Sequence, residues 1–358
     1  MVKELVFHIG DHKTGSTSIQ QALVQGAVKC DHTTLAYPVG RARLNHKVAA
    51  DTLFKKDKLK QKKRAFKTIQ RRMAKAEADI GIVSAESFEV VKPQVLQNAI
   101  AKFIPEHAET VRVIAYARPH AERILSSYTQ VLKLGNFTGT LEDFARHSDR
   151  VGRYQYFPRF DAWRDQFGDR FEVRPMIRDR LLGGDVVKDF MSYVLRSEDF
   201  TLEEVVGANE SLSINDVVML RAFHRMPQTG QRKVDVRGKA GWHFARVLAD
   251  LPNANKTRLS LHKSLMDEIE VSYRKDAEAM DAAFFEGTPL ADALDRAHAK
   301  ALPEAQGLEL GDHFDPEAAR MIRVWAALVD DLLARRPQDW RGYFRRMWLR
   351  SMKMEDAA

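Results

Sequence analysis

Four short apolar segments alternate with helical segments in the first 200 residues, and this alternation constrains the fold more than any other feature. The apolar segments span residues 4–9, 80–84, 110–117 and 170–177 and are rich in β-branched and aromatic residues. Strands that alternate with helices pair in parallel, because each connection crosses back over the sheet and covers one face. We therefore predict an α/β fold of three layers, with a central, mainly parallel sheet flanked by helices.

The rest of the chain predicts further helices and a domain boundary. Apolar residues recur at spacings of three and four over residues 16–26, 94–103, 119–134 and 183–195, and over much of the chain beyond about 210. The exception is 227–257, where scattered Gly, Pro and Asn predict irregular structure. We expect one α/β domain over 1–290 and a helical C-terminal extension over 291–358, packed on the same domain.

Polar turns follow three of the predicted strands, at residues 10–15, 84–88 and 117–119. The carboxyl ends of parallel strands meet at one edge of the sheet, where α/β proteins bind their ligands. We therefore expect the three turns to converge on one crevice.

The first turn, HIGDHKTGSTSIQ, is close to the nucleotide-binding pattern G-x-x-x-x-G-K-[ST] but places its lysine differently. Gly10, Gly15 and Thr17 match the pattern, whereas Ser16 occupies the lysine position and the lysine is Lys13. A glycine turn that opens a helix forms an anion site from backbone N–H groups alone. The hydroxyls and Lys13 would add donors and positive charge.

The third turn begins ARPHAERILSSYTQ, residues 117–130. Arg118 leaves the buried strand, and Ser126 lies two turns into the next helix. An arginine fork with a hydroxyl is a suitable clamp for a phosphate monoester. Arg123 has three open interpretations: a cofactor contact, a pair with Glu122, or a solvated side chain.

Both stretches resemble the cofactor motifs of sulfotransferases that use 3′-phosphoadenosine 5′-phosphosulfate (PAPS). In that family the loop lysine comes early and G-[ST]-[ST] follows it, as in HKTGSTS. The second motif, R-x-P-x-[DE]-R-x-x-S-x-Y, matches at Arg118, Glu122, Arg123, Ser126 and Tyr128, but here the proline directly follows the arginine. The resemblance covers about residues 4–290 and is to bacterial, carbohydrate-directed members.

The resemblance implies a P-loop-type fold and transfer of a sulfuryl group from PAPS to a hydroxyl, in line and without a metal, leaving adenosine 3′,5′-bisphosphate. It implies a carbohydrate or glycoconjugate acceptor. Lys13 would stabilise the bridging oxygen, where charge accumulates. The implied cofactor residues are His12, Lys13, Thr14, Gly15, Ser16 and Thr17 in the loop, with Arg118 and Ser126 at the 3′-phosphate. No His, Cys or Asp cluster has the spacing of a metal site.

A hydroxyl acceptor needs a group to take its proton. Glu86, just past the second strand, is our candidate, because carbohydrate-directed members often use a glutamate. The competing interpretation of Glu86 is a helix-capping acid that only positions the turn. His12 is the second candidate for the base, and His8, inside the first strand, is expected to be a buried structural histidine. In NESLS, Asn209 and Ser211 predict a helix N-cap, and the resemblance places that stretch near the adenine end of the cofactor.

Positive charge is concentrated in one segment. Residues 55–75 hold eleven Lys or Arg and one acid, a net charge of +10, although the whole chain carries only +8. One interpretation is a solvated helix that buries Leu59, Phe66, Ile69 and Met73, and the other is a landing surface for an anionic acceptor or nucleotide.

Composition limits the remaining classes. The chain has 358 residues, is 44% hydrophobic and contains no run of 18 apolar residues, so we expect no membrane span. No export signal precedes the first strand, and the single cysteine, Cys30, suits a reducing compartment, so we expect a cytoplasmic protein. Two alternative functions stay open: a magnesium-dependent phosphotransferase, and a non-catalytic module that binds nucleotides or nucleic acid, although the scarcity of aromatic residues in 55–75 makes nucleic acid the weaker partner.

Overall fold

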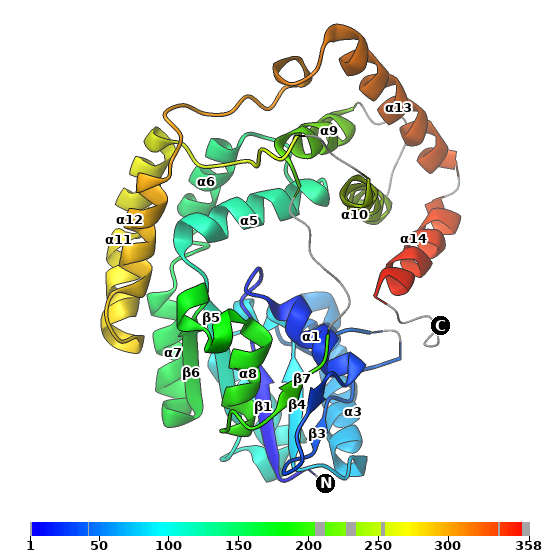
Figure 1. Ribbon diagram of the computed structural model, residues 1–358. Coiled ribbons are helices and arrows are strands. Elements are labelled where there is room, and N and C mark those ends of the chain that lie inside the picture. Colours follow the sequence, from blue (N-terminus) through cyan, green and yellow to red (C-terminus); the bar gives the residue numbers. More distant parts are fainter. Residues whose placement is uncertain are drawn as a thin grey trace. The chain divides into compact units, whose positions relative to one another are not determined.

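The computed structural model describes residues 2–41, 43–204, 212–226, 234–251, 255–335 and 337–352 (Figure 1). Its contacts divide the chain into two compact units. The first unit comprises Met1–Pro119, Gln155–Val206 and Lys275–Ala293, and the second comprises His120–Tyr154, Gly207–Arg274 and Leu294–Ala358. Each unit is assembled from three separate stretches of the chain, so this division does not test a single boundary. The expected domain boundary near residue 290 stays a prediction.

The first unit is built on a five-stranded sheet in which every pairing is parallel. Its strand order is β3 (Leu35–Ala36), β4 (Ile80–Ser84), β1 (Glu4–His8), β5 (Arg112–Ala117) and β6 (Phe171–Pro175). In the register, His8 lies opposite both Ser84 and Ile114, so these three strands end close to one another. Two two-residue strands, β2 (Val28–Lys29) and β7 (Thr201–Leu202), form a separate antiparallel ribbon.

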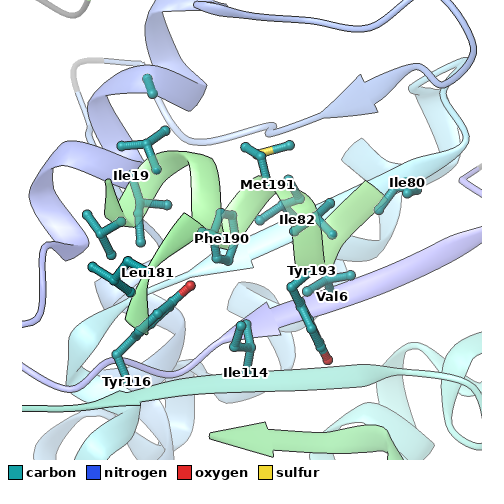
Figure 2. Close-up of a cluster of buried hydrophobic side chains, with 14 of the residues drawn as sticks. Val6, Ile19, Ile80, Ile82, Ile114, Tyr116, Leu181, Phe190, Met191 and Tyr193 are labelled. Atoms are coloured by element: carbon teal, nitrogen blue, oxygen red, sulfur yellow. The ribbon is translucent and has the colours of Figure 1, made fainter. Parts of the chain in front are cut away.

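Helices α1 (Ser16–Gln25) and α8 (Val186–Leu195) cover one face of this sheet. Alternate strand residues point into the layer, and Figure 2 shows Val6, Ile82 and Ile114 in one cluster with Ile19 and Phe190. All five side chains are fully buried. Each large apolar side chain removed from water contributes about 1.5–3 kcal/mol, so this cluster fixes the helix that follows the first turn against the sheet.

The opposite face is covered by α3 (Lys62–Lys75), α4 (Pro93–Phe103) and α7 (Phe157–Phe167). Met73 of α3 lies against Gly81 of β4, where an added Cβ would be 2.7 Å from its sulfur. Trp163 of α7 stacks on Phe171 of β6 with ring centroids 6.2 Å apart. The helix–sheet–helix arrangement confirms the predicted three-layer α/β fold.

The basic segment is not the single helix that we predicted. It consists of the 3-10 helix η1 (Lys56–Gln61) followed by α3, and it is joined to the site by α2 (Lys47–Phe54). Phe66, Ile69 and Met73 are buried as expected, but Leu59 is 43% exposed, so its place in the apolar stripe was wrong. A 3-10 helix has three residues per turn, which shifts Leu59 out of phase with the 3.6-residue period of α3.

The second unit is helical in the regions that the structure describes. Its helices are α5 (His120–Lys133), α6 (Leu141–Arg150), α9 (Ile214–Arg225), α10 (Val234–Asp250), α13 (Pro316–Arg335) and α14 (Pro337–Ser351), while α11 (Lys263–Phe284) and α12 (Pro289–Ala299) contribute to both units. Short 3-10 helices complete the chain: η2 (Glu86–Val90), η3 (Pro105–His107), η4 (Gly168–Arg170), η5 (Arg178–Arg180), η6 (Leu182–Gly184) and η7 (Leu310–Asp312). The helical C-terminal part is as predicted. Within the described ranges, no helix is both long and apolar enough to cross a membrane.

Helix α10 overturns the expectation of irregular structure over residues 227–257. Its glycines serve close packing and do not end the helix: a Cβ on Gly241 would be 2.2 Å from the carbonyl oxygen of Lys133, and one on Gly238 would be 3.2 Å from that of Leu134. Glycine therefore lets α10 approach the end of α5, and this tertiary packing outweighs its low helix propensity.

The N-cap of α9 is Ser213. Its hydroxyl accepts the N–H of Asp216 at 3.2 Å, and the Asp216 carboxylate accepts the N–H of Ser213 at 2.9 Å, a capping box. The predicted cap residues Asn209 and Ser211 lie outside the described residues.

Candidate functional site

The first turn leaves β1 alongside β5 and enters α1. The N–H of Tyr116 donates to the carbonyl of Gly10 at 2.8 Å, so the turn stays attached to the sheet beyond the end of the strand. Gly15 is the N-cap of α1, with φ of 77°, and no side chain caps the helix. The first turn of α1 holds no acidic residue either. Backbone N–H groups and the positive end of the helix dipole therefore meet here without a neutralising side chain, as an anion site requires.

The hydroxyls of Thr14 and Ser16 brace the turn from within. Both donate to the carbonyl oxygen of Asp11, at 2.6 Å and 3.0 Å, and both residues are buried. Their contribution to a bound anion would come from the backbone. Thr17 is half-buried on the first turn of α1.

A buried ion pair that the sequence did not predict anchors the same turn. Asp11 is fully buried, and the Arg159 guanidinium of α7 donates to its two carboxylate oxygens at 2.8 Å and 2.6 Å. Burial alone lowers the pKa of Arg159, but the carboxylates of Asp11 and Glu89 together outweigh burial and the pKa is raised. The two residues are 148 positions apart, and nothing in the local sequence of either indicates the other.

The third turn meets the first through Arg118. Its Nη1 donates to the carbonyl oxygen of Lys13 at 3.0 Å, and its own carbonyl accepts the hydroxyl of Tyr156 at 2.8 Å. Lys13 has a φ of 64°, a left-handed conformation that is uncommon outside glycine. Two predicted cofactor residues from turns 105 positions apart are therefore in contact, through the Arg118 guanidinium and the Lys13 backbone carbonyl.

The second turn meets the first through Glu86. Gly10, with φ of 105°, lies so close that an added Cβ would be 3.1 Å from the Cα of Glu86. The Oε2 of Glu86 accepts from the amides of Gln20 at 3.2 Å and Asn45 at 3.4 Å. The side chain is half-buried and fixed from two sides. All three turns therefore converge, as predicted, and Glu86 is a positioned carboxylate at their junction.

A second proton acceptor sits on the loop itself. The backbone N–H of His12 donates to Oε2 of Glu89 at 3.0 Å, and the ring Nδ1 of His12 lies 2.6 Å from the same oxygen. A carboxylate accepts hydrogen bonds, which assigns the ring proton to Nδ1 and leaves Nε2 as the basic nitrogen. The His12 side chain is 42% exposed, whereas that of Glu89 is 9% exposed. The sequence indicated His12 as a possible base but did not indicate Glu89 as its orienting partner.

His8 is the structural histidine that the sequence predicts. It is fully buried in β1, and its Nδ1 lies 2.8 Å from the hydroxyl of Ser84. Burial lowers its pKa to about 4, so the ring is neutral at physiological pH.

The remaining residues of the second motif lie on α5, in the second unit. Arg123 is 1% exposed and its guanidinium lies over the ring of Tyr154, 5.5 Å from the centroid, which excludes the solvated interpretation. Tyr128 is buried and donates to the carbonyl of Gly139 at 3.0 Å. Ser126 is half-buried, and its joint role with Arg118 stays a prediction.

In chemical terms, the first unit combines the features that an anion site requires with two hydrogen-bonded side chains that are able to accept a proton. The uncapped start of α1, Lys13 and Arg118 supply donors and positive charge, while Glu86 and His12 can accept a proton. Among the residues that the structure describes, no group of three or more His, Cys, Asp or Glu side chains is placed to hold a metal ion.

Comparison with known proteins gives one distant structural similarity. No family model matches the sequence, and no curated protein matches it. Among solved structures, the crystal structure of a sulfotransferase from Alicyclobacillus acidocaldarius is similar at 15% sequence identity. The match covers 68% of this chain and 97% of that chain, with a TM-score of 0.39. Similarity this distant does not identify a substrate or a site, so the function is inferred from this chain's own residues.

Proposed function

We propose that this protein is a sulfotransferase that moves a sulfuryl group from PAPS to a hydroxyl acceptor by in-line displacement. The observation that carries the proposal is the hydrogen bond from Arg118 to the carbonyl of Lys13. It joins the two stretches that resemble the family's cofactor motifs, beside an uncapped helix N-terminus. A cofactor with phosphate at one end and phosphosulfate at the other needs two such cationic centres.

The chain's own groups divide the work. The backbone N–H groups at the start of α1 would hold the 5′-phosphosulfate, and Lys13 would stabilise charge on the bridging oxygen. Arg118, with Ser126, would hold the 3′-phosphate. PAPS supplies the activated sulfuryl group, and a sulfuryl group carries too little charge to require a bridging metal.

Glu86 is the proposed general base, with the His12–Glu89 pair as the alternative. The Oε2 of Glu86 already accepts two amide hydrogen bonds, which position the carboxylate for a hydroxyl. Glu86→Gln keeps the shape and removes the basicity, so we expect at least about 100-fold slower transfer with unchanged bisphosphate affinity. His12→Gln tests the alternative. If it slows transfer at least about 100-fold while Glu86→Gln does not slow transfer, His12 is the base.

The acceptor is proposed to be an anionic glycan because a basic surface adjoins this site. Lys63, Lys67, Arg71 and Lys75 are exposed and lie four residues apart, which puts them on one side of α3. Like charges at this spacing destabilise a helix by about 0.2–0.5 kcal/mol per pair. A row of four with no acid among them is therefore better explained by a polyanionic partner than by helix stability.

Helix α2 connects the basic surface to Glu86. At its start Lys47 donates to the hydroxyl of Ser87 at 2.7 Å, next to Glu86. Asp51 is buried in the same helix. Its carboxylate forms ion pairs with Lys55 at 3.0 Å and Lys58 at 3.3 Å, two lysines at the beginning of the basic segment. The helix is eight residues long, so the basic segment begins about 12 Å from the junction of the turns.

Titration calorimetry separates the three candidate functions. We expect adenosine 3′,5′-bisphosphate to bind without magnesium and Arg118→Ala to weaken it at least about tenfold, while Arg146→Ala, an exposed arginine of the second unit, leaves it unchanged. A preference for magnesium–ATP would instead indicate a phosphotransferase. Binding of a DNA duplex but neither nucleotide would indicate a non-catalytic module.

Transfer itself is measured with sulfur-labelled PAPS and a panel of anionic and neutral glycans. Lys13→Ala should reduce transfer by at least about 100-fold, the usual effect of removing one donor to developing charge. Neutralising the row with Lys63→Gln and Lys67→Gln should raise the KM for an anionic glycan and leave a neutral acceptor unaffected. If neutralising the row leaves the KM for the anionic glycan at its wild-type value, the basic surface has no role in binding the acceptor.

A further inference from the structure

Helix α13 is apolar on two sides, and only one of them is covered. Ala319, Ala326 and Leu333 are buried in clusters with residues of α9, α10 and α14. The other side carries six large apolar side chains that are 37–60% exposed, which we call the α13 stripe: Met321, Val324, Trp325, Leu328, Val329 and Leu332.

The stripe is a continuous surface. Its members recur at three and four residues, which places them within one arc along about 16 Å of helix. Together they expose on the order of 500 Å² of apolar side chain, a large patch for a soluble monomer. Val271, which is 85% exposed on α11, is by contrast a single exposed residue of the ordinary kind.

Two charges border the stripe on the same side. Arg320 and Asp331 are eleven residues apart, or three helical turns, so both lie along one edge. Arg320 is exposed, with only a 3.7 Å ion pair to the exposed Glu317. The midpoint between Arg320 and Asp331 and the midpoint between Met321 and Leu332 both fall within one residue of Ala326.

The shared midpoint of the charges and the stripe points to a second copy of α13 as the partner. When two copies of α13 pack antiparallel about a two-fold axis near Ala326, each Arg320 faces Asp331 of the second copy, and the two stripes cover each other. A parallel two-fold pair would place this edge of the two helices on opposite sides of the interface, so Arg320 of one copy would not meet Asp331 of the other. The charges therefore favour self-pairing of one orientation.

We propose that α13 joins two copies of this chain as an antiparallel helix pair. Two stripes bury on the order of 1,000 Å² in total, the lower limit for a specific interface. The dimer is therefore concentration-dependent and dissociates in the micromolar range. The proposal does not depend on the function proposed above.

Sedimentation velocity over about 1–100 μM tests the proposal on the full chain. We expect the mass to rise toward twice 40.9 kDa with concentration. Leu328→Asp should hold the protein as a monomer, because it places a charge inside the stripe. Val271→Asp, the matched control outside it, should dimerise as the wild type does. Circular dichroism and Tm confirm that both variants are folded.

Charge exchange tests the antiparallel orientation. Arg320→Asp alone and Asp331→Arg alone should each weaken the dimer at least about fivefold, and the double variant should restore it, because each pair is then re-formed with reversed sign. A wild type that stays monomeric at 100 μM would overturn the proposal, even if the stripe bound lipid vesicles or another protein. A dimer that withstands Leu328→Asp, or a double variant without recovery, would overturn it equally.

Discussion

The buried ion pair between Asp11 and Arg159 gives the sharpest prediction about stability. Asp11→Asn removes the negative charge and leaves the guanidinium against Phe160, whose centroid is 4.1 Å away, without its counter-charge. Asp11 is fully buried and the Arg159 side chain is 22% exposed, so little water can replace the carboxylate. Breaking a buried pair from one side costs about 3–5 kcal/mol. For a chain of this size we expect Tm to fall by roughly 6 °C or more.

A second two-bonded arginine–carboxylate pair, which differs in burial, provides the control. Arg146 donates to both oxygens of Glu268 at 2.8 Å, but the two side chains are 57% and 43% exposed. Solvent screens this pair, so Glu268→Gln should leave Tm unchanged within error.

Scanning calorimetry at pH 7 makes the comparison. Bisphosphate affinity is a second readout, because the backbone carbonyl of Asp11 accepts the hydroxyls of Thr14 and Ser16 and moves with the residue. Adding Arg159→Met to Asp11→Asn removes the unpaired charge and should recover part of the loss. Equal Tm shifts for Asp11→Asn and Glu268→Gln would refute the reasoning, because fork geometry and not burial would then decide the cost.

Two further predictions concern acid stability and the first turn. Burial lowers the pKa of both His8 and His46 to about 4, whereas each binds a proton near pH 6.5 when unfolded. The unfolded state therefore holds more protons between these values, and the free energy of unfolding should fall as the pH drops from 6.5 toward 4, by up to about 1.4 kcal/mol per pH unit for each histidine. Urea titrations at pH 5 and 7 measure this slope, and His8→Gln should reduce it; an unchanged slope would contradict the assignment. Gly15→Ala would set a Cβ 2.6 Å from Val186 Cγ1, so it should lower both Tm and bisphosphate affinity, whereas Gly26→Ala, also at positive φ but with nothing within 4 Å, should cost only about 1–2 kcal/mol and spare binding. Equal losses in calorimetry would show that the contact with Val186 is unimportant.

The sheet was largely predictable, because each of its main strands is recognisable from its own short stretch of sequence. Residues 80–84 coincide with β4, and β1, β5 and β6 fall within the other predicted segments. Strands β1, β4 and β5 are compact apolar runs, as strands buried on both faces require, whereas β6 at the sheet edge alternates apolar residues with Glu172 and Arg174. Strand β3 was missed because two residues, Leu35 and Ala36, are too few to form a pattern.

Only the contacts that follow from the order of strands and turns along the chain could be predicted for the site. Three turns at strand ends had to meet, and the contact of Arg118 with Lys13 follows from that topology. The pairing of His12 with Glu89 does not follow, because the two residues are 77 positions apart and each is unremarkable in its own segment. Gly241 shows the reverse case: local propensity indicates a break, and only the nearby Lys133 carbonyl explains the helix.

The division of the chain into interleaved units has a consequence for its synthesis. The α/β unit draws its last stretch from Lys275–Ala293, which includes Asp276, and the carboxylate of Asp276 accepts the N–H groups of Tyr156 and Phe157 at 2.8 Å. Helix α7, which carries Arg159, therefore lacks its N-terminal acceptor until that stretch has left the ribosome. At about 5–20 residues per second, Asp276 emerges roughly 13–53 seconds after the loop that holds Lys13. A fragment that ends before residue 275 lacks the carboxylate that fixes the start of α7, the helix that carries Arg159.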